Sequence, residues 1–156
     1  MIRVWFNHWF STSYGIIQLM KQAELDISVI ATNLEINSVI QNVCDEWYPE
    51  PSCDGDHYVD ACLEFCLAHR IDVFVPRRNM IEISKNKECF ERIGVRLLLD
   101  DYDKIELLND KARTYAFLSD VTGVHIPEYE VVHTVDQFEK AYALLKKNYK
   151  KYVLSS

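Results

Sequence analysis

The residues best suited to metal chemistry are Cys62, Cys66 and His69, which follow one another at i, i+4 and i+7. In a helix this spacing places all three on one face, and Cys53 or His57 could supply a fourth ligand. Structural zinc sites instead bring paired ligands on short loops, at spacings that this stretch lacks. The two cysteines also share their stripe with apolar side chains, and free cysteine is among the most buried residue types. We therefore predict a core role for them and no metal site.

A second polar group lies in "NHWFSTSYG", directly after a run that is typical of a buried strand. Sheets of α/β proteins place their ligand loops at this end of a strand. Only Gly15 is present, so the GxGxxG dinucleotide fingerprint is absent. His8, Ser11, Thr12 and Ser13 could bind a small anionic group at a helix N-terminus, or the hydroxyls could simply cap that helix. The sequence favours the cap and leaves the anion site open.

Arg77 and Arg78 follow another strand-like run, "IDVFV", and so face the same edge of the predicted sheet. Arginine forks suit carboxylates and phosphates, so an anion contact and plain solvation are equally good interpretations. The acidic pair Asp45 and Glu46 lies in a proline-bounded stretch, Asp45–Pro51, which we predict to be a loop after a helix. We expect both carboxylates to be solvated, as most acidic side chains are.

The candidate residues above lie next to four short apolar runs, which we predict to be the strands that position them. These runs are rich in β-branched and aromatic residues and nearly continuous in hydrophobicity, which is typical of strands buried on both faces of a parallel sheet. Strands alternating with helices favour right-handed β-α-β units. We predict a three-layer, Rossmann-like α/β domain over residues 1–109, with strands at Ile2–Phe6, Asp26–Ala31, Ile71–Val75 and Val95–Leu99.

Helix-compatible stretches with a spacing near 3.6 stand between these runs. The first begins near Ser11–Ser13, where a hydroxyl can cap the first turn. The others cover residues 56–70 and 79–94, and Gly94 is a natural C-terminal stop.

The pattern changes after Leu99. Residues 100–111 are charged and predict a boundary or a connecting helix. A helix at Lys111–Val121, a short strand near residues 129–134 and a helix at Val135–Asn148 follow. The last residues, "KYVLSS", read as a strand whose neighbours are missing, so we expect a truncated chain.

Composition excludes several classes of protein. The 156 residues carry a formal net charge of -7 without a basic stripe, which argues against binding to nucleic acids or anionic membranes. No run approaches the roughly 18 apolar residues of a membrane span, and the first residues lack a signal-peptide pattern. The five cysteines contain no CxxC pair. We expect a cytoplasmic protein with reduced thiols.

The whole chain resembles the N-terminal part of ATP-grasp enzymes, in the branch of carbamoyl-phosphate synthase large subunits and biotin carboxylases. The stretches that carry the resemblance are "DEWYPEPSCDGDHYVDACLEFCLAHRIDVFVP" and "FERIGVRLLLDDYDKIELLNDKARTYAFLSDVTGVHIPEY". Their order and spacing matter more than any single motif. The resemblance implies a pre-ATP-grasp domain over residues 1–109 and a partial ATP-grasp α+β subdomain over residues 110–156.

It also implies chemistry for the intact enzyme, in which ATP and Mg²⁺ activate a carboxylate as an acyl phosphate that an amine or similar nucleophile attacks. Lys111 would contact ATP, and Asp110 would cap the helix that Lys111 opens. The partners would be a C-terminal ATP-grasp region and a small carboxylate substrate, and a homodimer stays open. We expect the chain alone to be inactive, with no tightly bound cofactor. The alternatives are a stand-alone α/β module that binds a small ligand without catalysis, and an interaction domain that docks to an enzyme.

Overall fold

The computed structural model describes residues 1–7 and 12–150 of the chain. The chain forms two compact units, Met1–Leu107 and Leu108–Ser156. Helix α5 (Tyr102–Asn109) crosses the boundary between them. Among the described residues, no helix combines the length and the apolar character that a membrane crossing requires.

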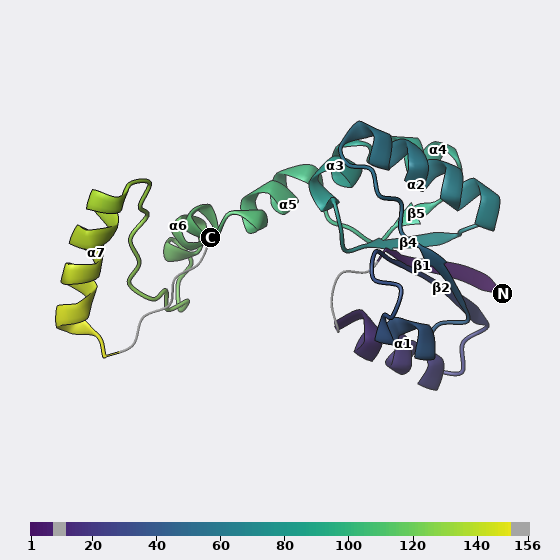
Figure 1. Cartoon of the computed structure of the whole chain (residues 1–156), viewed down its shortest axis with the longest axis horizontal. Coiled ribbons are helices and arrows are strands. Elements are labelled where there is room, and N and C mark those ends of the chain that lie inside the picture. The colour runs from purple at the N-terminus through teal and green to yellow at the C-terminus, as the bar shows by residue number, and fades with distance from the viewer. Residues whose placement is uncertain (8–11, 151–156) are drawn as a thin grey trace. The chain divides into compact units, whose positions relative to one another are not determined.

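The first unit is built around a five-stranded sheet in the order β3-β2-β1-β4-β5. Every neighbouring pair is parallel, as the continuous hydrophobicity of the runs predicts. The α/β class and the Rossmann-like half order are therefore confirmed (Figure 1). The strands are β1 (Ile2–Asn7), β2 (Ile27–Asn33), β3 (Glu46–Pro49), β4 (Val73–Pro76) and β5 (Arg96–Leu97).

Alternate residues of each central strand enter two separate hydrophobic cores, because successive side chains point to opposite faces of a sheet. In β1, Trp5 packs in the core under α2, α3 and α4, whereas Val4 and Phe6 pack in the core under α1. Figure 1 shows α1 on one side of the sheet and the other three helices on the opposite side. The helical elements of this layered unit are α1 (Thr12–Gln22), η1 (Val39–Asn42), α2 (Asp56–His69), α3 (Met80–Lys85) and α4 (Lys87–Arg92).

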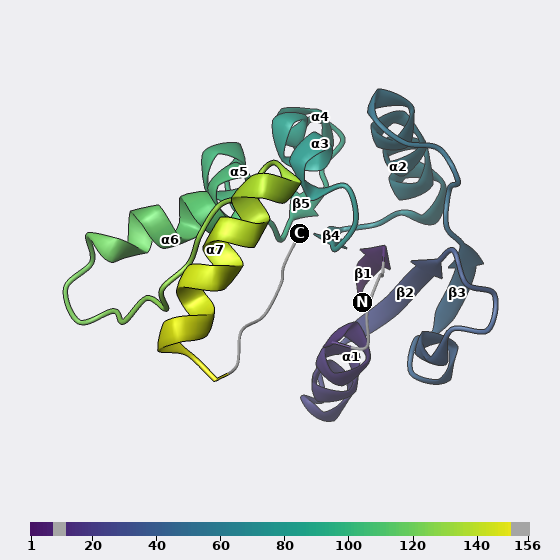
Figure 2. The same cartoon turned by 60° about the vertical axis from the view of Figure 1, so that its left-hand side comes forward.

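The structure corrects the prediction that Asp45–Pro51 is a loop after a helix. Its first half is strand β3, which pairs with β2 at one edge of the sheet (Figure 2), and only the short 3-10 helix η1 precedes it. The two prolines hid the strand, because proline marks loops more often than strands; an edge strand tolerates proline. The predicted helix over residues 79–94 is broken at Asn86 into α3 and α4, and Gly94 ends α4 with a φ of 81°.

Asp45 and Glu46 are not simply solvated, contrary to the sequence-based expectation. The Asp45 carboxylate accepts a hydrogen bond from the Val29 amide (2.7 Å) and pairs with Lys21. Burial acts to raise the pKa of Asp45, but these two contacts outweigh it and lower the pKa. Glu46 pairs with Arg3 at 2.8 Å. The contacts of the two acids therefore stabilise the edge of the sheet at β3.

The second unit contains α6 (Lys111–Ser119) and α7 (Val135–Asn148), close to the predicted bounds. Asp110 caps α6 by accepting a hydrogen bond from the Arg113 amide (3.0 Å), which confirms the prediction for Asp110. The strand predicted near residues 129–134 is wrong: the described part of the chain forms no ladder there. A strand needs a neighbour to share its hydrogen bonds, and the described residues of this unit are otherwise helices and turns. The strand predicted at residues 151–156 lies outside the described residues.

Candidate functional site

The candidate site lies at the carboxyl ends of β1 and β4, which are neighbours in the sheet. After β1 the chain continues to α1 on one face, and after β4 it continues to α3 on the opposite face. The two connections therefore diverge at this point. In open α/β sheets such a switch in direction creates the crevice in which ligands bind.

Asn7, the last residue of β1, holds the turn after β4. Its side chain is fully buried, and its Oδ1 accepts hydrogen bonds from the amides of Arg77 (2.5 Å) and Arg78 (3.4 Å). Its Nδ2 donates to the Tyr58 hydroxyl (2.7 Å) and to the carbonyl of Arg78 (3.2 Å). One amide side chain thus fixes the backbone of both arginines and joins β1, β4 and α2.

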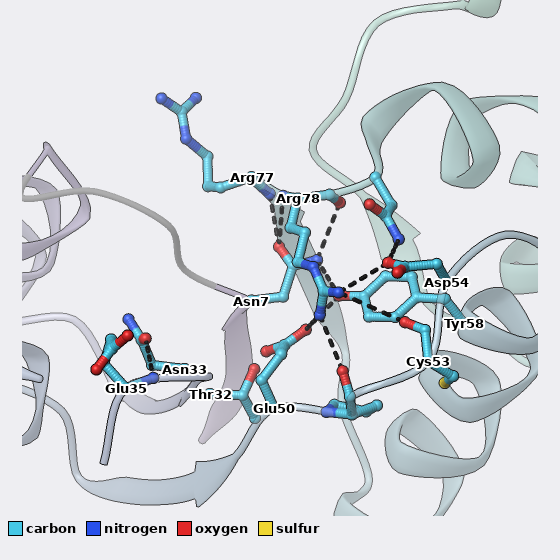
Figure 3. A network of polar contacts seen from close by, with 12 residues as sticks. Asn7, Thr32, Asn33, Glu35, Glu50, Cys53, Asp54, Tyr58, Arg77 and Arg78 are labelled. Atoms are coloured by element: carbon cyan, nitrogen blue, oxygen red, sulfur yellow. Dashed lines mark hydrogen bonds and ion pairs between the residues drawn. The ribbon is translucent and has the colours of Figure 1, made fainter. Parts of the chain in front are cut away.

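Arg78 is turned into the protein (Figure 3), and its side chain is only 12% exposed. The guanidinium pairs with Asp54 at 2.8 Å and lies 3.9 Å from Glu50. It donates to the carbonyl of Pro51 (2.9 Å) and stacks over the Tyr58 ring, with 4.8 Å to the centroid. The sequence left open whether the arginines contact an anion or are simply solvated. Arg78 does contact anions, but they are carboxylates of its own chain.

Glu50 is the most deeply buried carboxylate of this network, with a side chain that is 1% exposed. Its Oε1 accepts a hydrogen bond from the Tyr58 hydroxyl, whereas no hydrogen bond of ordinary geometry from the described part of the chain reaches Oε2. Burial raises the pKa of Glu50, and the Thr32 hydroxyl, the Tyr58 hydroxyl and the Arg78 charge offset this only in part. Burial also raises the pKa of Tyr58, so Tyr58 stays a neutral donor.

We expect Glu50→Gln to flatten the pH dependence of stability. The pKa of Glu50 in the folded protein lies above its ordinary value of 4.5, so its stabilising contribution is complete below that value and is lost as pH rises through the folded pKa. Glutamine keeps a carbonyl oxygen for Tyr58 and has no proton to lose. Urea unfolding between about pH 4.5 and pH 8 measures how steeply the free energy of unfolding changes with pH. Glu64→Gln on the exposed side of α2 is the control, and an equal slope in the wild type and Glu50→Gln would contradict the expectation.

The structure places the remaining predicted residues as follows. Thr12 and Ser13 lie in the first turn of α1; Thr12 is exposed, whereas Ser13 is buried and its Oγ has no hydrogen-bond partner among the described residues. His8 and Ser11 lie outside the described residues. The exposed Arg77 side chain points away from the Arg78 network (Figure 3). In the second unit, Lys111 is exposed and opens α6.

The core role predicted for Cys62 and Cys66 is confirmed, because both are buried against Trp5 and its neighbours. Burial raises the pKa of both thiols, that of Cys66 to about 12, so neither is a ready thiolate ligand. His69 instead packs its ring against Phe65, with 4.2 Å between centroids. Across residues 1–7 and 12–150 we find no group of three side chains suited to a metal ion.

Sequence reasoning missed the residues that organise this site. Asn7 is far in the sequence from Glu50, Asp54 and Tyr58, and the four residues carry no recognisable motif. One available signal was Glu50, a lone acid between two prolines immediately after an apolar stretch. The contacts themselves depend on the sheet order, which brings the ends of β3, β1 and β4 together.

Comparison with known proteins shows the same fold in much larger chains. No protein-family model matches the sequence, and no curated protein sequence matches it. Among solved structures, the biotin carboxylase subunit of pyruvate carboxylase is 19% identical with a TM-score of 0.56, covering 93% of this chain and 33% of that one. The biotin carboxylase domain of a single-chain bacterial carboxylase is 18% identical with a TM-score of 0.57, covering 95% and 34%.

A third structure is the biotin carboxylase domain dimer of 2-oxoglutarate carboxylase from Hydrogenobacter thermophilus, in complex with MgADP, ADP and bicarbonate. It is 19% identical with a TM-score of 0.57, covering 91% of this chain and 32% of that one. This chain therefore spans about a third of the length of the proteins that it matches. At this level of identity the similarity concerns the fold: the chain has the fold of the corresponding third of biotin carboxylase domains.

Proposed function

We propose that this chain is the N-terminal part of an ATP-grasp enzyme of the biotin carboxylase-like branch, which uses ATP and Mg²⁺ to activate a carboxylate as an acyl phosphate. In this proposal residues 1–109 are the pre-ATP-grasp domain and residues 110–156 begin the ATP-grasp subdomain. A nucleophile, most often an amine, takes up the activated acyl group. The C-terminal ATP-grasp region and the carboxylate substrate are the expected partners, and cytoplasmic location and a homodimer stay predictions.

The observation that carries this proposal is the fold match, which extends over more than nine-tenths of this chain and includes both units. A Rossmann-like domain alone would be weak support, because that fold hosts many unrelated functions. The match also includes the helices after the domain. The third solved structure described above holds MgADP and bicarbonate, which agrees with ATP, Mg²⁺ and a carboxylate-like substrate.

The proposal is tested on the natural gene product that contains this chain. We expect it to bind MgATP and to form ADP when its carboxylate substrate is present, and bicarbonate is the first probe because a solved structure of the same fold binds it. The 156-residue chain alone is expected to form no ADP, since catalysis of phosphoryl transfer depends on metal and cation clamps that enclose the phosphates. A natural gene product that neither binds nor hydrolyses ATP would overturn the proposal.

Lys111→Ala is expected to weaken MgATP binding to the natural gene product by about tenfold, the effect of losing one phosphate contact of about 1.4 kcal/mol. Lys111 is exposed at the first position of α6, where the N-terminal end of the helix adds a field favourable to phosphate. Calorimetric titration with MgATP measures the change.

The matched control is Lys140→Ala, which removes the same charge from an exposed position on α7. The far-ultraviolet circular dichroism of both variants should match that of the wild type. If both variants bind MgATP as the wild type does, Lys111 is not a nucleotide contact.

On the substrate side we propose that the loops after β1 and β4 face the carboxylate substrate, with His8, Ser11, Thr12, Ser13, Arg77 and Arg78 as the candidate residues. The internal contacts of Arg78 favour a supporting role for it, and the exposure of Arg77 favours ligand contact.

A second candidate function is a stand-alone ligand-binding module without catalysis. The observation that favours it is the two-sided core of the first unit, which needs no further domain to cover its sheet faces. Calorimetry separates the two functions. Micromolar binding of a small metabolite without nucleotide favours the module, whereas binding that requires the natural gene product and MgATP favours the ligase.

A further inference from the structure

The connection between β3 and α2, residues 50–55, is held to the neighbouring strand ends mainly by one side chain. The Arg78 guanidinium donates to the carbonyls of Pro51 (2.9 Å) and Cys53 (3.5 Å), and it pairs with Asp54 at 2.8 Å. Figure 3 shows these contacts gathered around the guanidinium. The β3–α2 loop, as we call residues 50–55, therefore depends on a cation that belongs to the connection after β4.

The first residue of the β3–α2 loop buries a carboxyl group beneath it. The Glu50 side chain is 1% exposed, and no hydrogen bond of ordinary geometry from the described residues reaches its Oε2. The Arg78 guanidinium is 3.9 Å from Oε1, whereas it is 2.8 Å from Asp54. A buried carboxylate is stable only when its charge is closely paired and its oxygens are hydrogen-bonded. The closed loop therefore accommodates the neutral carboxyl better than the carboxylate.

The groups that face Glu50 do not reverse this preference. Arg78 approaches from the connection after β4, Tyr58 and Cys62 lie on α2, and β2 contributes the uncharged Thr32 hydroxyl. Burial raises the pKa of Tyr58 and of Cys62, so both remain neutral. Burial also raises the pKa of Glu50, and the two hydroxyls and the Arg78 charge offset only part of that rise.

The two ends of the β3–α2 loop allow it to move while the sheet and α2 stay folded. At the first end, the Glu50 amide donates to the carbonyl of Asn33 at 3.0 Å, which continues the pairing of β3 with β2. At the other end, Gly55 has a φ of 62°, and a side chain placed there would meet no atom within 4 Å. Glycine changes its backbone torsions at little cost. Opening of such a loop requires less free energy than unfolding of the whole unit.

We propose that the β3–α2 loop is a pH-sensitive clasp beside the candidate site, which Arg78 and the protonated Glu50 side chain keep closed and which ionisation of Glu50 opens. Opening brings the carboxylate into water and releases the loop from Arg78. The closed loop binds the Glu50 proton more tightly than the open loop, so opening becomes easier as pH rises above 4.5, the ordinary pKa of glutamate. Every contact lies within the first unit, so the inference holds for either function considered above.

The test follows alkylation of Cys53 by iodoacetamide in the 156-residue chain, with the labelled sites assigned by peptide mass spectrometry. The Cys53 thiol belongs to the loop, donates to the carbonyl of His57 (3.5 Å) and packs against the core. At each pH its rate is divided by the rate of the same thiol in the urea-unfolded chain, which removes the pH dependence of the thiol itself. We expect this ratio to rise about threefold or more between about pH 5 and pH 8, and to stay constant in Glu50→Gln.

Cys66 is the internal control, because it is 1% exposed in the core and is reached only when the unit unfolds. Its ratio should stay at least about tenfold below that of Cys53. His57→Gln removes an exposed histidine beside the loop, the type of side chain that ordinarily changes charge in this pH range, and should leave the rise unchanged. Asp54→Asn weakens the hold of Arg78 and should raise the Cys53 ratio about twofold or more at pH 5, where Glu50 is most protonated.

Four results would overturn the inference. They are a Cys53 ratio that does not change with pH in the wild type, an equal rise in the wild type and Glu50→Gln, a rise that disappears in His57→Gln, and a Cys66 ratio that rises in parallel with that of Cys53. If Glu50→Gln does not fold, the wild type, His57→Gln and Asp54→Asn still decide the question. ATP binding by the natural gene product has no bearing on these results, so the clasp and the ligase proposal succeed or fail separately.

Discussion

Replacement of Arg78 by methionine is expected to lower the free energy of unfolding by about 3–5 kcal/mol at pH 8, because it leaves the buried Glu50 carboxylate without its cation. Methionine keeps an unbranched apolar side chain but removes the guanidinium that lies over Tyr58, and it satisfies none of the carboxylate or carbonyl acceptors. The loss should be smaller near pH 5, where Glu50 takes up a proton more readily than an ordinary carboxyl does. Urea unfolding at the two pH values measures both effects.

The double variant Arg78→Met with Glu50→Gln separates charge from packing. If the unpaired carboxylate causes the loss, removing it should recover about half of the lost stability at pH 8 and abolish the difference between the two pH values. The fraction that is not recovered belongs to Asp54 and the carbonyl of Pro51, which lose a donor in both variants. If the double variant were no more stable than Arg78→Met at pH 8, the unpaired Glu50 carboxylate would not be the cause of the lost stability.

The second large effect is expected for Trp5→Ala, with a loss of about 3–5 kcal/mol. Trp5 is fully buried at the centre of β1 and stacks on Phe74, with 4.0 Å between the ring centroids. A second ring, that of Phe65, lies 4.4 Å away, and the indole Nε1 donates to Thr32 at 3.0 Å. The truncation therefore removes packing on the α2 side of the sheet and leaves the Thr32 hydroxyl without its donor. Guanidinium unfolding at constant pH measures the loss.

Leu67→Ala is the control for this truncation, because Leu67 is 60% exposed on α2 and its removal opens no cavity. Its expected effect is within about 0.5 kcal/mol. If the effects of Trp5→Ala and Leu67→Ala were similar, Trp5 would not be the centre of this core, and the layered packing described above would need revision.

Signals within single segments of the sequence were enough to identify most of the strands and helices. The strands β1, β2 and β4 follow from short continuous apolar runs, and the helix at Val135–Asn148 also follows from the pattern within one segment. The caps were equally local, since Asp110 and Gly94 act on the turn beside them. The class of fold then follows from the alternation of strands and helices.

Only the tertiary structure decided which polar residues meet. Strand β3 was hidden because Pro49 at its end and Pro51 just beyond it signal a loop, and its pairing with β2 depends on an edge position that no local pattern reveals. Arg77 and Arg78 are neighbours of the same type, and only the positions of Glu50 and Asp54 make one of them structural. Asn7, which joins β1, β4 and α2, reads in the sequence as the first residue of the turn after a strand. Periodicity is a property of a single segment, whereas a buried polar network is a property of several segments brought together, so the sequence determined the layers and the fold determined the site.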